Sequence, residues 1–139
     1  MESAKIVVAD DEFAVVRSVC RLLARAGYCC LPARDGEEAL QLVQSEKPSA
    51  ILLDLDMPGI NGLEVLRQLK ADPELRHIPV CILSAIGTFV QRDGTPLEHA
   101  WAVMPKPFEP RGLLHMVREM LRNPEREQAG VGPEEILPL

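Results

Sequence analysis

The sequence has few aromatic residues, few cysteines and no long apolar run. Its 139 residues include one Trp, one Tyr, three Phe and four Cys. No apolar stretch approaches the roughly 20 residues that a membrane-spanning helix needs. The first residues lead directly into a predicted strand, without the layout of a signal peptide. We therefore expect a cytoplasmic protein with no membrane segment.

An excess of positive charge is also missing. The formal net charge is -6, whereas affinity for the phosphate backbone of nucleic acids needs clustered Lys and Arg. No basic helix-turn-helix pattern follows the predicted core. Direct binding of nucleic acid is therefore not expected. The 47% hydrophobic and 26% charged content is typical of an ordinary globular domain.

The four cysteines lack the spacing of a zinc site or of a C-x-x-C motif. Cys20, Cys29, Cys30 and Cys81 all lie in apolar stretches, where a reduced thiol packs as a small hydrophobe. Neighbours on a strand point to opposite faces, so Cys29 and Cys30 cannot both face one partner. We expect four free thiols in the core, in a reducing compartment, with no redox role.

Short apolar runs alternate regularly with amphipathic stretches. The apolar runs predict buried strands at 5–9, 28–31, 50–53, 80–83 and 102–104. Helices are predicted at 12–26, from the N-cap Asp35 to 46, from the N-cap Asn61 to a point before Pro73, and at 110–122. This order predicts an α/β doubly wound parallel sheet flanked by helices, with right-handed crossovers.

Two segments break the regular pattern. A helix is expected at 88–100, but Gly94 and Pro96 lie in its middle. Gly costs about 1 kcal/mol and Pro about 3 kcal/mol in a helix interior, so this fourth helix should be short or irregular. Charge, Gly and Pro near the end predict a flexible tail or linker at 124–139 after a domain at 1–123.

Polar residues follow four of the predicted strands. Asp10 and Asp11 follow the first, Asp54 the third, Ser84 the fourth and Lys106 the fifth. Each alone would be an ordinary turn or surface residue. The carboxyl ends of parallel strands share one edge of the sheet, so together they gather three carboxylates, a hydroxyl and an ammonium. Such a set indicates a site for a divalent cation and a phosphoryl group.

The motifs around these residues resemble the receiver domain of two-component response regulators, over residues from about 4 to 122. They read V-V-A-D-D-E, I-L-L-D-L-D-M-P-G-I-N-G, L-S-A and K-P-F, in that order. The resemblance implies a flavodoxin-like sheet of strand order 2-1-3-4-5. It implies a phosphoacceptor signalling domain, not an enzyme, whose partners are a sensor histidine kinase or phosphotransfer protein and an unknown downstream protein. A homodimer is left open.

The resemblance also assigns the acidic residues. It implies that Asp54 is the phosphoacceptor and that Asp11 and Asp54 bind Mg²⁺ directly, with Mn²⁺ as an alternative ion. Asp10 would act through water, and Asp56 through its backbone carbonyl. Mg²⁺ prefers oxygen ligands and keeps several waters, which suits such a set.

The remaining assignments concern the phosphoryl group. The resemblance implies that Ser84 donates a hydrogen bond to it and that Lys106 pairs with it. The peptide bond between Lys106 and Pro107 is expected to be cis. Phosphoryl transfer places charge on the equatorial oxygens, which Lys106 could stabilise.

One strand departs from the family pattern. Val103 stands where the family usually has Tyr or Phe, and Trp101 is expected on the same strand face two residues earlier. Trp101 could fill part of that space, although we favour a partly buried packing residue. Pro105 is tolerable inside the fifth strand if that strand lies at an edge, as the strand order of the family implies. Our hypothesis is that phosphorylation occurs but is read without the usual aromatic switch.

Two other functions fit parts of the pattern. Asp54-Leu-Asp56 after an apolar strand also resembles haloacid-dehalogenase phosphatases, but their paired acidic residues come late in the chain, and this chain is short for that fold. The second alternative is a phosphorylation-independent interaction module. An unchanged partner interaction in Asp54→Asn would favour it.

Overall fold

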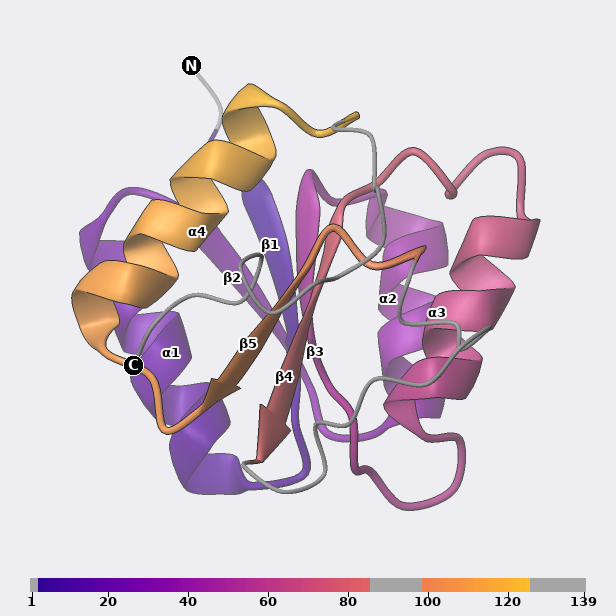
Figure 1. The fold of residues 1–139 in the computed structure, drawn as a ribbon, viewed down its shortest axis with the longest axis horizontal. Coiled ribbons are helices and arrows are strands. Elements are labelled where there is room, and N and C mark those ends of the chain that lie inside the picture. Colours follow the sequence, from indigo (N-terminus) through magenta and orange to yellow (C-terminus); the bar gives the residue numbers. More distant parts are fainter. Residues whose placement is uncertain (1–2, 86–98, 126–139) are drawn as a thin grey trace.

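Five parallel strands form the centre of the molecule, and the computed structural model describes residues 3–85 and 99–125. The elements are β1 (Lys5–Ala9), α1 (Phe13–Arg25), β2 (Cys29–Ala33), α2 (Gly36–Glu46), β3 (Ala50–Asp54), α3 (Gly62–Ala71), β4 (Val80–Ala85), β5 (Ala102–Lys106) and α4 (Pro110–Arg122). The strand order is β2-β1-β3-β4-β5 (Figure 1). The predicted α/β fold and strand order are confirmed. Most of the irregular helix expected at 88–100, as far as residue 98, and residues 126–139 of the tail expected at 124–139 lie outside the described residues.

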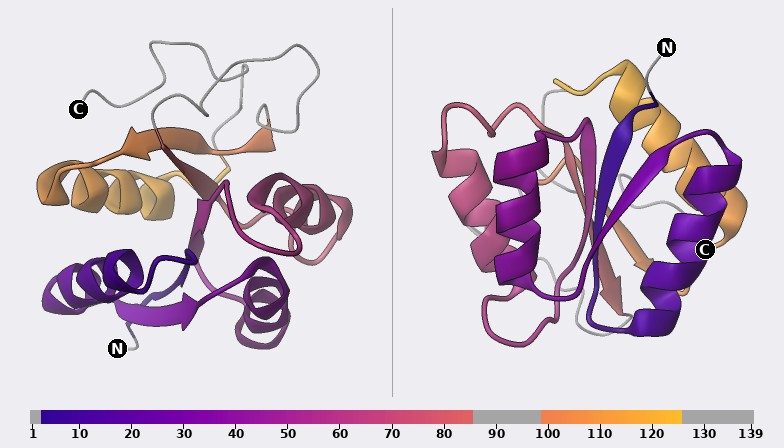
Figure 2. Two further views of the ribbon diagram at one scale, coloured as in Figure 1. Left: turned by 90° about the horizontal axis from the view of Figure 1, so that it is seen from below. Right: turned by 180° about the vertical axis from the view of Figure 1, so that it is seen from behind.

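The helices cover both faces of the sheet (Figure 2). Residues of α2 and α3 pack with one set of strand side chains, including Ile51 and Leu53. Residues of α1 and α4 pack with the other set, including Ile6 and Leu52. All four strand side chains are fully buried, which explains the continuous apolar runs of the inner strands. Among the described residues no helix combines the length and apolar character needed to cross a membrane.

Two predicted helix caps are present. Asp35 accepts a hydrogen bond from the Glu38 backbone N–H at 2.8 Å, and Asn61 accepts one from the Glu64 N–H at 3.0 Å. Each bond satisfies a donor that the first helical turn leaves unpaired. The Glu38 side chain accepts from the Arg34 N–H at 2.7 Å, not from the N-cap residue itself.

The prolines that lie inside strands are found in the two edge strands. Pro32 lies in β2 and Pro105 in β5, and each of these strands has one neighbour in the part of the chain that the structure describes. A missing N–H is tolerated at an edge because no further strand needs it there. The edge position that the resemblance implied for the fifth strand is confirmed. Strands β4 and β5 extend two residues beyond their predicted ends, which places Ser84 and Lys106 inside strands.

Trp101 does not share a face with Val103. It precedes β5 and packs with the residues of α1 and α4, whereas Val103 packs on the side of α2 and α3. The predicted common face is wrong because side chains alternate regularly only inside the strand. Trp101 is 5% exposed and donates its Nε1–H to the Asn123 carbonyl at 2.9 Å. It is a packing residue, as we favoured.

The cysteines also differ from expectation. Cys20 in α1 and Cys30 in β2 form a disulfide with a Cα–Cα distance of 5.3 Å, and Cys29 is exposed. The prediction of four free thiols in the core is therefore wrong for these three. It is right for Cys81, where burial raises the thiol pKa to about 12. The pairing depends on how α1 packs on β2, which spacing along the chain does not show.

Candidate functional site

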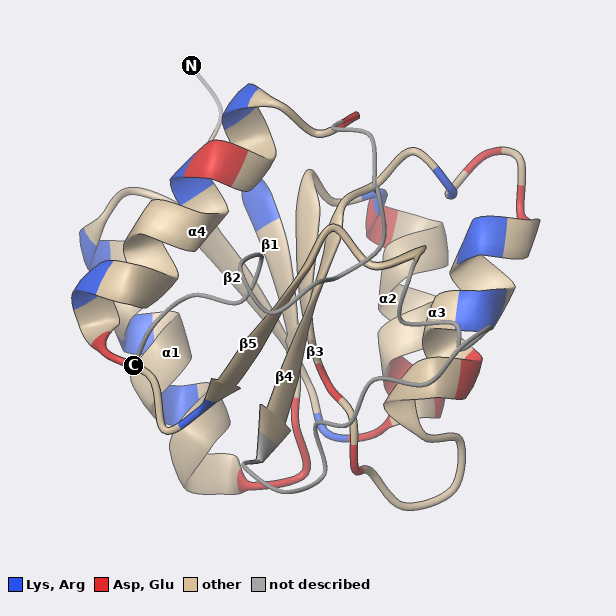
Figure 3. Ribbon diagram, in the orientation of Figure 1, with Lys and Arg blue, Asp and Glu red and all other residues tan. Residues whose placement is uncertain are grey.

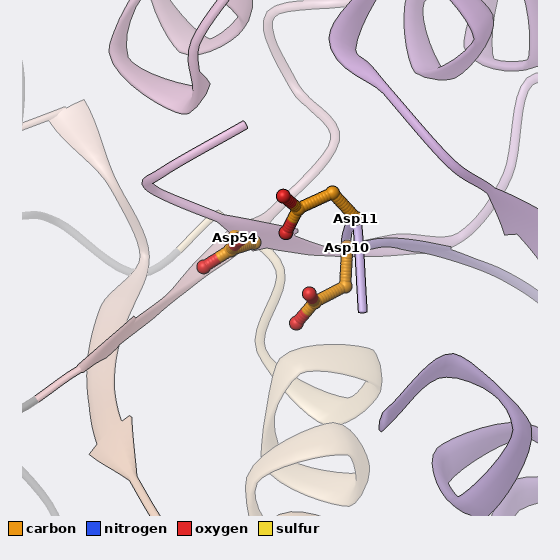
Figure 4. Close-up of side chains that lie close together, drawn as sticks. All are labelled: Asp10, Asp11 and Asp54. Atoms are coloured by element: carbon orange, nitrogen blue, oxygen red, sulfur yellow. The ribbon is translucent and has the colours of Figure 1, made fainter. Parts of the chain in front are cut away.

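The carboxyl ends of β1, β3 and β5 bring the acidic residues and the lysine together. Asp10 follows β1, Asp54 ends β3 and Lys106 ends β5. Figure 3 shows acidic ribbon at the ends of β1 and β3 and basic ribbon at the tip of β5. Asp10, Asp11 and Asp54 each offer a carboxylate oxygen, and these oxygens lie within 4.8 Å of one another (Figure 4). The predicted convergence is therefore present.

Lys106 joins the buried carboxylates. Its Nζ lies 2.7 Å from Asp10 Oδ2 and 3.3 Å from Asp54 Oδ1. Asp10 is fully buried and Asp54 is 4% exposed, whereas Asp11 is exposed. The ammonium thus offsets part of the two buried negative charges, and Asp11 is the member of the cluster that is exposed to solvent.

The charges at this edge are only partly balanced. Burial, followed by repulsion from Asp10, raises the pKa of Asp54 to about 6, although Lys106 and a hydrogen bond from the Asp56 backbone act in the opposite direction. Burial alone would lower the pKa of Lys106, but its hydrogen bond to Asp10 and its attraction to Asp10 and Asp54 raise it. The lysine is therefore held charged, while Asp54 carries an uncompensated cost of ionisation.

The three carboxylates suit a hard divalent cation. They offer oxygen ligands without thiol or imidazole, and Mg²⁺ binds through one or two carboxylates while keeping waters. A cation beside Asp10, Asp11 and Asp54 would also relieve their mutual repulsion. The donor chemistry therefore fits the predicted Mg²⁺.

The start of α3 fixes the backbone around Asp54. Gly62 donates its N–H to the Leu55 carbonyl at 3.0 Å. A Cβ on Gly62 would overlap the backbone carbonyl of Asp54, so glycine permits this close approach. The loop between β3 and α3 is thereby held against the end of β3, next to the acidic cluster.

Ser84 and Pro107 lie where the sequence predicts. Ser84 is fully buried in β4, one residue beyond Leu83, the register partner of Asp54. Its role toward a phosphoryl group stays a prediction. The Lys106–Pro107 peptide bond is cis, as predicted.

Glu12 is a member of the cluster that the sequence did not single out. It precedes α1, donates its N–H to Asp10 Oδ1 at 2.9 Å and places Oε1 3.3 Å from Lys106 Nζ. The only signal was its position directly after Asp10 and Asp11. Together with Lys106 it borders a largely apolar groove of about 540 Å³ that continues past Val15 and Phe108.

A comparison with protein families finds a family model that matches most of the chain. The family model of the response regulator receiver domain covers residues 6–118. The chain belongs to this family. The receiver domain is 38% identical over 127 residues to the response regulator MprA of Mycobacterium bovis, with 91% of this chain and 54% of the relative covered. The chain thus spans about half the length of the curated relatives it matches.

Solved structures show the same fold. A putative response regulator from Chloroflexus aurantiacus has a TM-score of 0.80 at 30% identity, over 87% of this chain and 99% of that one. The chemotaxis response regulator CheY4 of Vibrio cholerae has a TM-score of 0.77 at 27% identity, over 86% and 99%. The haloacid-dehalogenase alternative is therefore wrong: the order of the motifs belongs to the receiver family.

Proposed function

We propose that this receiver domain accepts a phosphoryl group on Asp54 in a reaction that depends on Mg²⁺. The donor would be the phosphohistidine of a sensor kinase or of a phosphotransfer protein in the cytoplasm. The observation that supports the proposal most is the convergence of Asp10, Asp11, Asp54 and Lys106 at one edge of the sheet. Domains of this family act in two-component signalling.

The residues divide the chemistry between them. An Asp54 carboxylate oxygen forms a bond to phosphorus as the bond from phosphorus to the donor nitrogen breaks. Lys106 keeps its proton and stabilises charge on the phosphoryl oxygens, and Ser84 donates a hydrogen bond to them. When bound by Asp11 and Asp54, with Asp10 through water and the Asp56 carbonyl, Mg²⁺ or Mn²⁺ supplies further positive charge.

We further propose that the domain acts as a switch and not as an enzyme with external turnover. It would promote only its own phosphorylation and dephosphorylation, and it would signal to a downstream protein or output domain. The buried side chains of Val103 and Ser84 lie on neighbouring strands β5 and β4. The downstream response would be read without an aromatic residue at position 103.

The test is incubation of the full chain with acetyl phosphate and Mg²⁺, followed by mass spectrometry of the intact protein and its peptides. We expect a mass gain of one phosphoryl group, located on Asp54 and absent when EDTA removes the metal. Asp54→Asn should gain nothing, and Glu37→Gln, an exposed acidic residue of α2, should react like the parent. A mass gain that persists in Asp54→Asn would overturn the assignment.

The phosphorylation-independent interaction module is separated by a second measurement. If the domain bound its downstream partner equally well with and without the phosphoryl group, and in Asp54→Asn, that alternative would hold. The charge balance of the site argues against it. A buried carboxylate whose pKa is raised to about 6 weakens the metal-free fold at neutral pH, a cost that a bound cation would offset.

A further inference from the structure

A second pocket lies at the other edge of the sheet, where β4 and β5 begin. It has a volume of about 200 Å³. The carboxyl ends of the strands, with Asp54 and Lys106, lie at the opposite end of the sheet (Figure 1). Its ionisable lining residues come from α3, from the connection to β4 and from the residues that flank β5 and α4: Lys70, Arg76, His77, His99 and Glu125. Four of the five are basic.

Lys70, in the last turn of α3, is held in position by two backbone carbonyls. Its Nζ donates to the Arg76 carbonyl at 2.9 Å and to the Ile78 carbonyl at 3.0 Å. An ammonium carries three N–H groups. Within residues 3–85 and 99–125 these are its two hydrogen bonds, and it forms no ion pair there. Its third N–H has no acceptor in this described part of the chain, so it is placed to donate to a group that enters the pocket.

The positive charge of Lys70 is not needed for its contacts with the protein. A neutral amine also has two N–H groups, enough for both carbonyls, so the connection between α3 and β4 could be held without charge. Burial lowers the pKa of Lys70 to about 8. Carboxylates beside Lys106 have the opposite effect on that lysine. An anion that binds beside such a half-buried lysine stabilises its charged form over its neutral form.

The surrounding side chains add to this preference. Arg76 adds a guanidinium with several N–H donors, and His77 and His99 add imidazole N–H groups. Glu125 is the one acidic residue of the lining. The pocket therefore offers a fixed ammonium, a guanidinium and two imidazoles against one carboxylate, in a volume that suits one small ion with water.

We propose that this pocket binds a small dianionic oxyanion of the sulfate or phosphate type, anchored by the Lys70 ammonium. The site is separate from the phosphoacceptor edge and does not depend on the chemistry of Asp54. Arg76 and the two imidazoles would contact the ion from the connection to β4 and from the residues before β5.

The protein carries its own reporter of this pocket. Trp101 lines it and is the single tryptophan of the chain. We would titrate the full chain, without Mg²⁺, with sodium sulfate at an ionic strength kept constant with sodium chloride, and follow Trp101 fluorescence. A saturable change is expected in the parent. Asp54→Asn should give the same curve, because the phosphoacceptor edge is not involved.

Variants of the pocket decide the assignment. Lys70→Met should weaken sulfate binding roughly tenfold or more, since a charge-assisted hydrogen bond is lost. Lys47→Met, which removes an exposed lysine outside the pocket, should leave binding unchanged. Should Lys70→Met not fold, Arg76→Gln provides the test, because Arg76 is exposed and its side chain makes no hydrogen bond or ion pair with the residues that the structure describes. Binding should weaken several-fold.

The pH dependence adds a second readout. Sulfate stays dianionic between about pH 6 and about pH 9, so a change in its affinity reports the protein alone. Affinity should fall as the pH rises through about 8, where Lys70 loses its proton, and this step should vanish in Lys70→Met. An equal response to chloride alone, or a Lys70→Met curve like that of the parent, would show an adventitious ion only and overturn the proposal.

Discussion

Asp54 is a buried acid whose surroundings disfavour its charge. Its side chain is 4% exposed, and Asp10, fully buried, adds like charge beside it. Lys106 is shared among Asp10, Asp54 and Glu12, so one ammonium faces three carboxylates. Without a metal ion, the ionised form of Asp54 is therefore less stable in the folded chain than in the unfolded chain.

This imbalance predicts that Asp54→Asn stabilises the metal-free protein at neutral pH. The folded pKa is about 6, against an ordinary value of 3.8. The folded state therefore binds more protons between these values, and stability falls as the pH rises from below 3.8 to above about 6. Asn resembles the protonated acid, so the variant should be more stable by up to about 3 kcal/mol at pH 7.5.

Urea unfolding in EDTA at several pH values measures this difference. It should shrink toward zero as the pH falls below about 4, where Asp54 is protonated in both states. The matched variant Glu37→Gln, in an exposed position of α2, should not show such a pH-dependent gain. A parent protein that is as stable as Asp54→Asn at pH 7.5 would contradict the expected cost of burial.

At the scale of elements, the disulfide between Cys20 and Cys30 ties α1 to β2. The two residues are separated by 10 positions in sequence. In the chain-entropy description, closing a loop of this size stabilises the fold by about 3 kcal/mol, because the unfolded chain loses freedom. Reduction should therefore lower the free energy of unfolding by a similar amount.

Urea unfolding with and without dithiothreitol checks this effect. The double variant Cys20→Ser, Cys30→Ser should unfold like the reduced parent and should not respond to the reductant. Thiol labelling supplies an internal control, because Cys29 is exposed and Cys81 is buried. The native oxidised protein should take one label, on Cys29. A parent that takes three labels before reduction would show that the bond is absent.

The elements themselves could be predicted from local pattern, but their contacts could not. Continuous apolar runs located all five strands, and the caps Asp35 and Asn61 located two helices. The bonded pair Cys20–Cys30 and the face of Trp101 depend on how a helix packs on a strand and on where a strand begins. The sequence also did not show that Ser84 is buried within β4, because a polar residue ends an apolar pattern without ending the strand.

At the scale of the candidate site, residue type and position were enough to predict which groups converge. Asp10, Asp11, Asp54 and Lys106 follow strands whose carboxyl ends share an edge, and the sheet brings them together. Glu12 was missed because its contact with Lys106 depends on a side-chain conformation at the start of α1. Residues that strands position are thus predictable, whereas those that depend on rotamers are not.

Across the whole molecule, the two ends of the sheet carry opposite imbalances of charge. The carboxyl edge gathers carboxylates around Lys106, and the amino edge gathers basic side chains around Lys70. Both lysines are partly buried, but carboxylates raise the pKa of Lys106 while burial lowers that of Lys70 to about 8. The sheet separates the two groups, so each edge should respond to its own ion.

The carboxyl edge gives a prediction for global stability. Mg²⁺ that binds the folded but not the unfolded chain stabilises it by RT ln(1 + [Mg²⁺]/Kd), about 1.4 kcal/mol at ten times Kd. The melting temperature of the parent should therefore rise with Mg²⁺ concentration.

Asp11 is exposed and contributes an oxygen to the cluster, so Asp11→Asn should keep the metal-free melting temperature and lose most of the rise. Glu37→Gln should keep both. An Asp11→Asn protein that gains as much stability from Mg²⁺ as the parent would place the ion elsewhere, because a site without that carboxylate would have only the two buried acids, which Lys106 already neutralises in part.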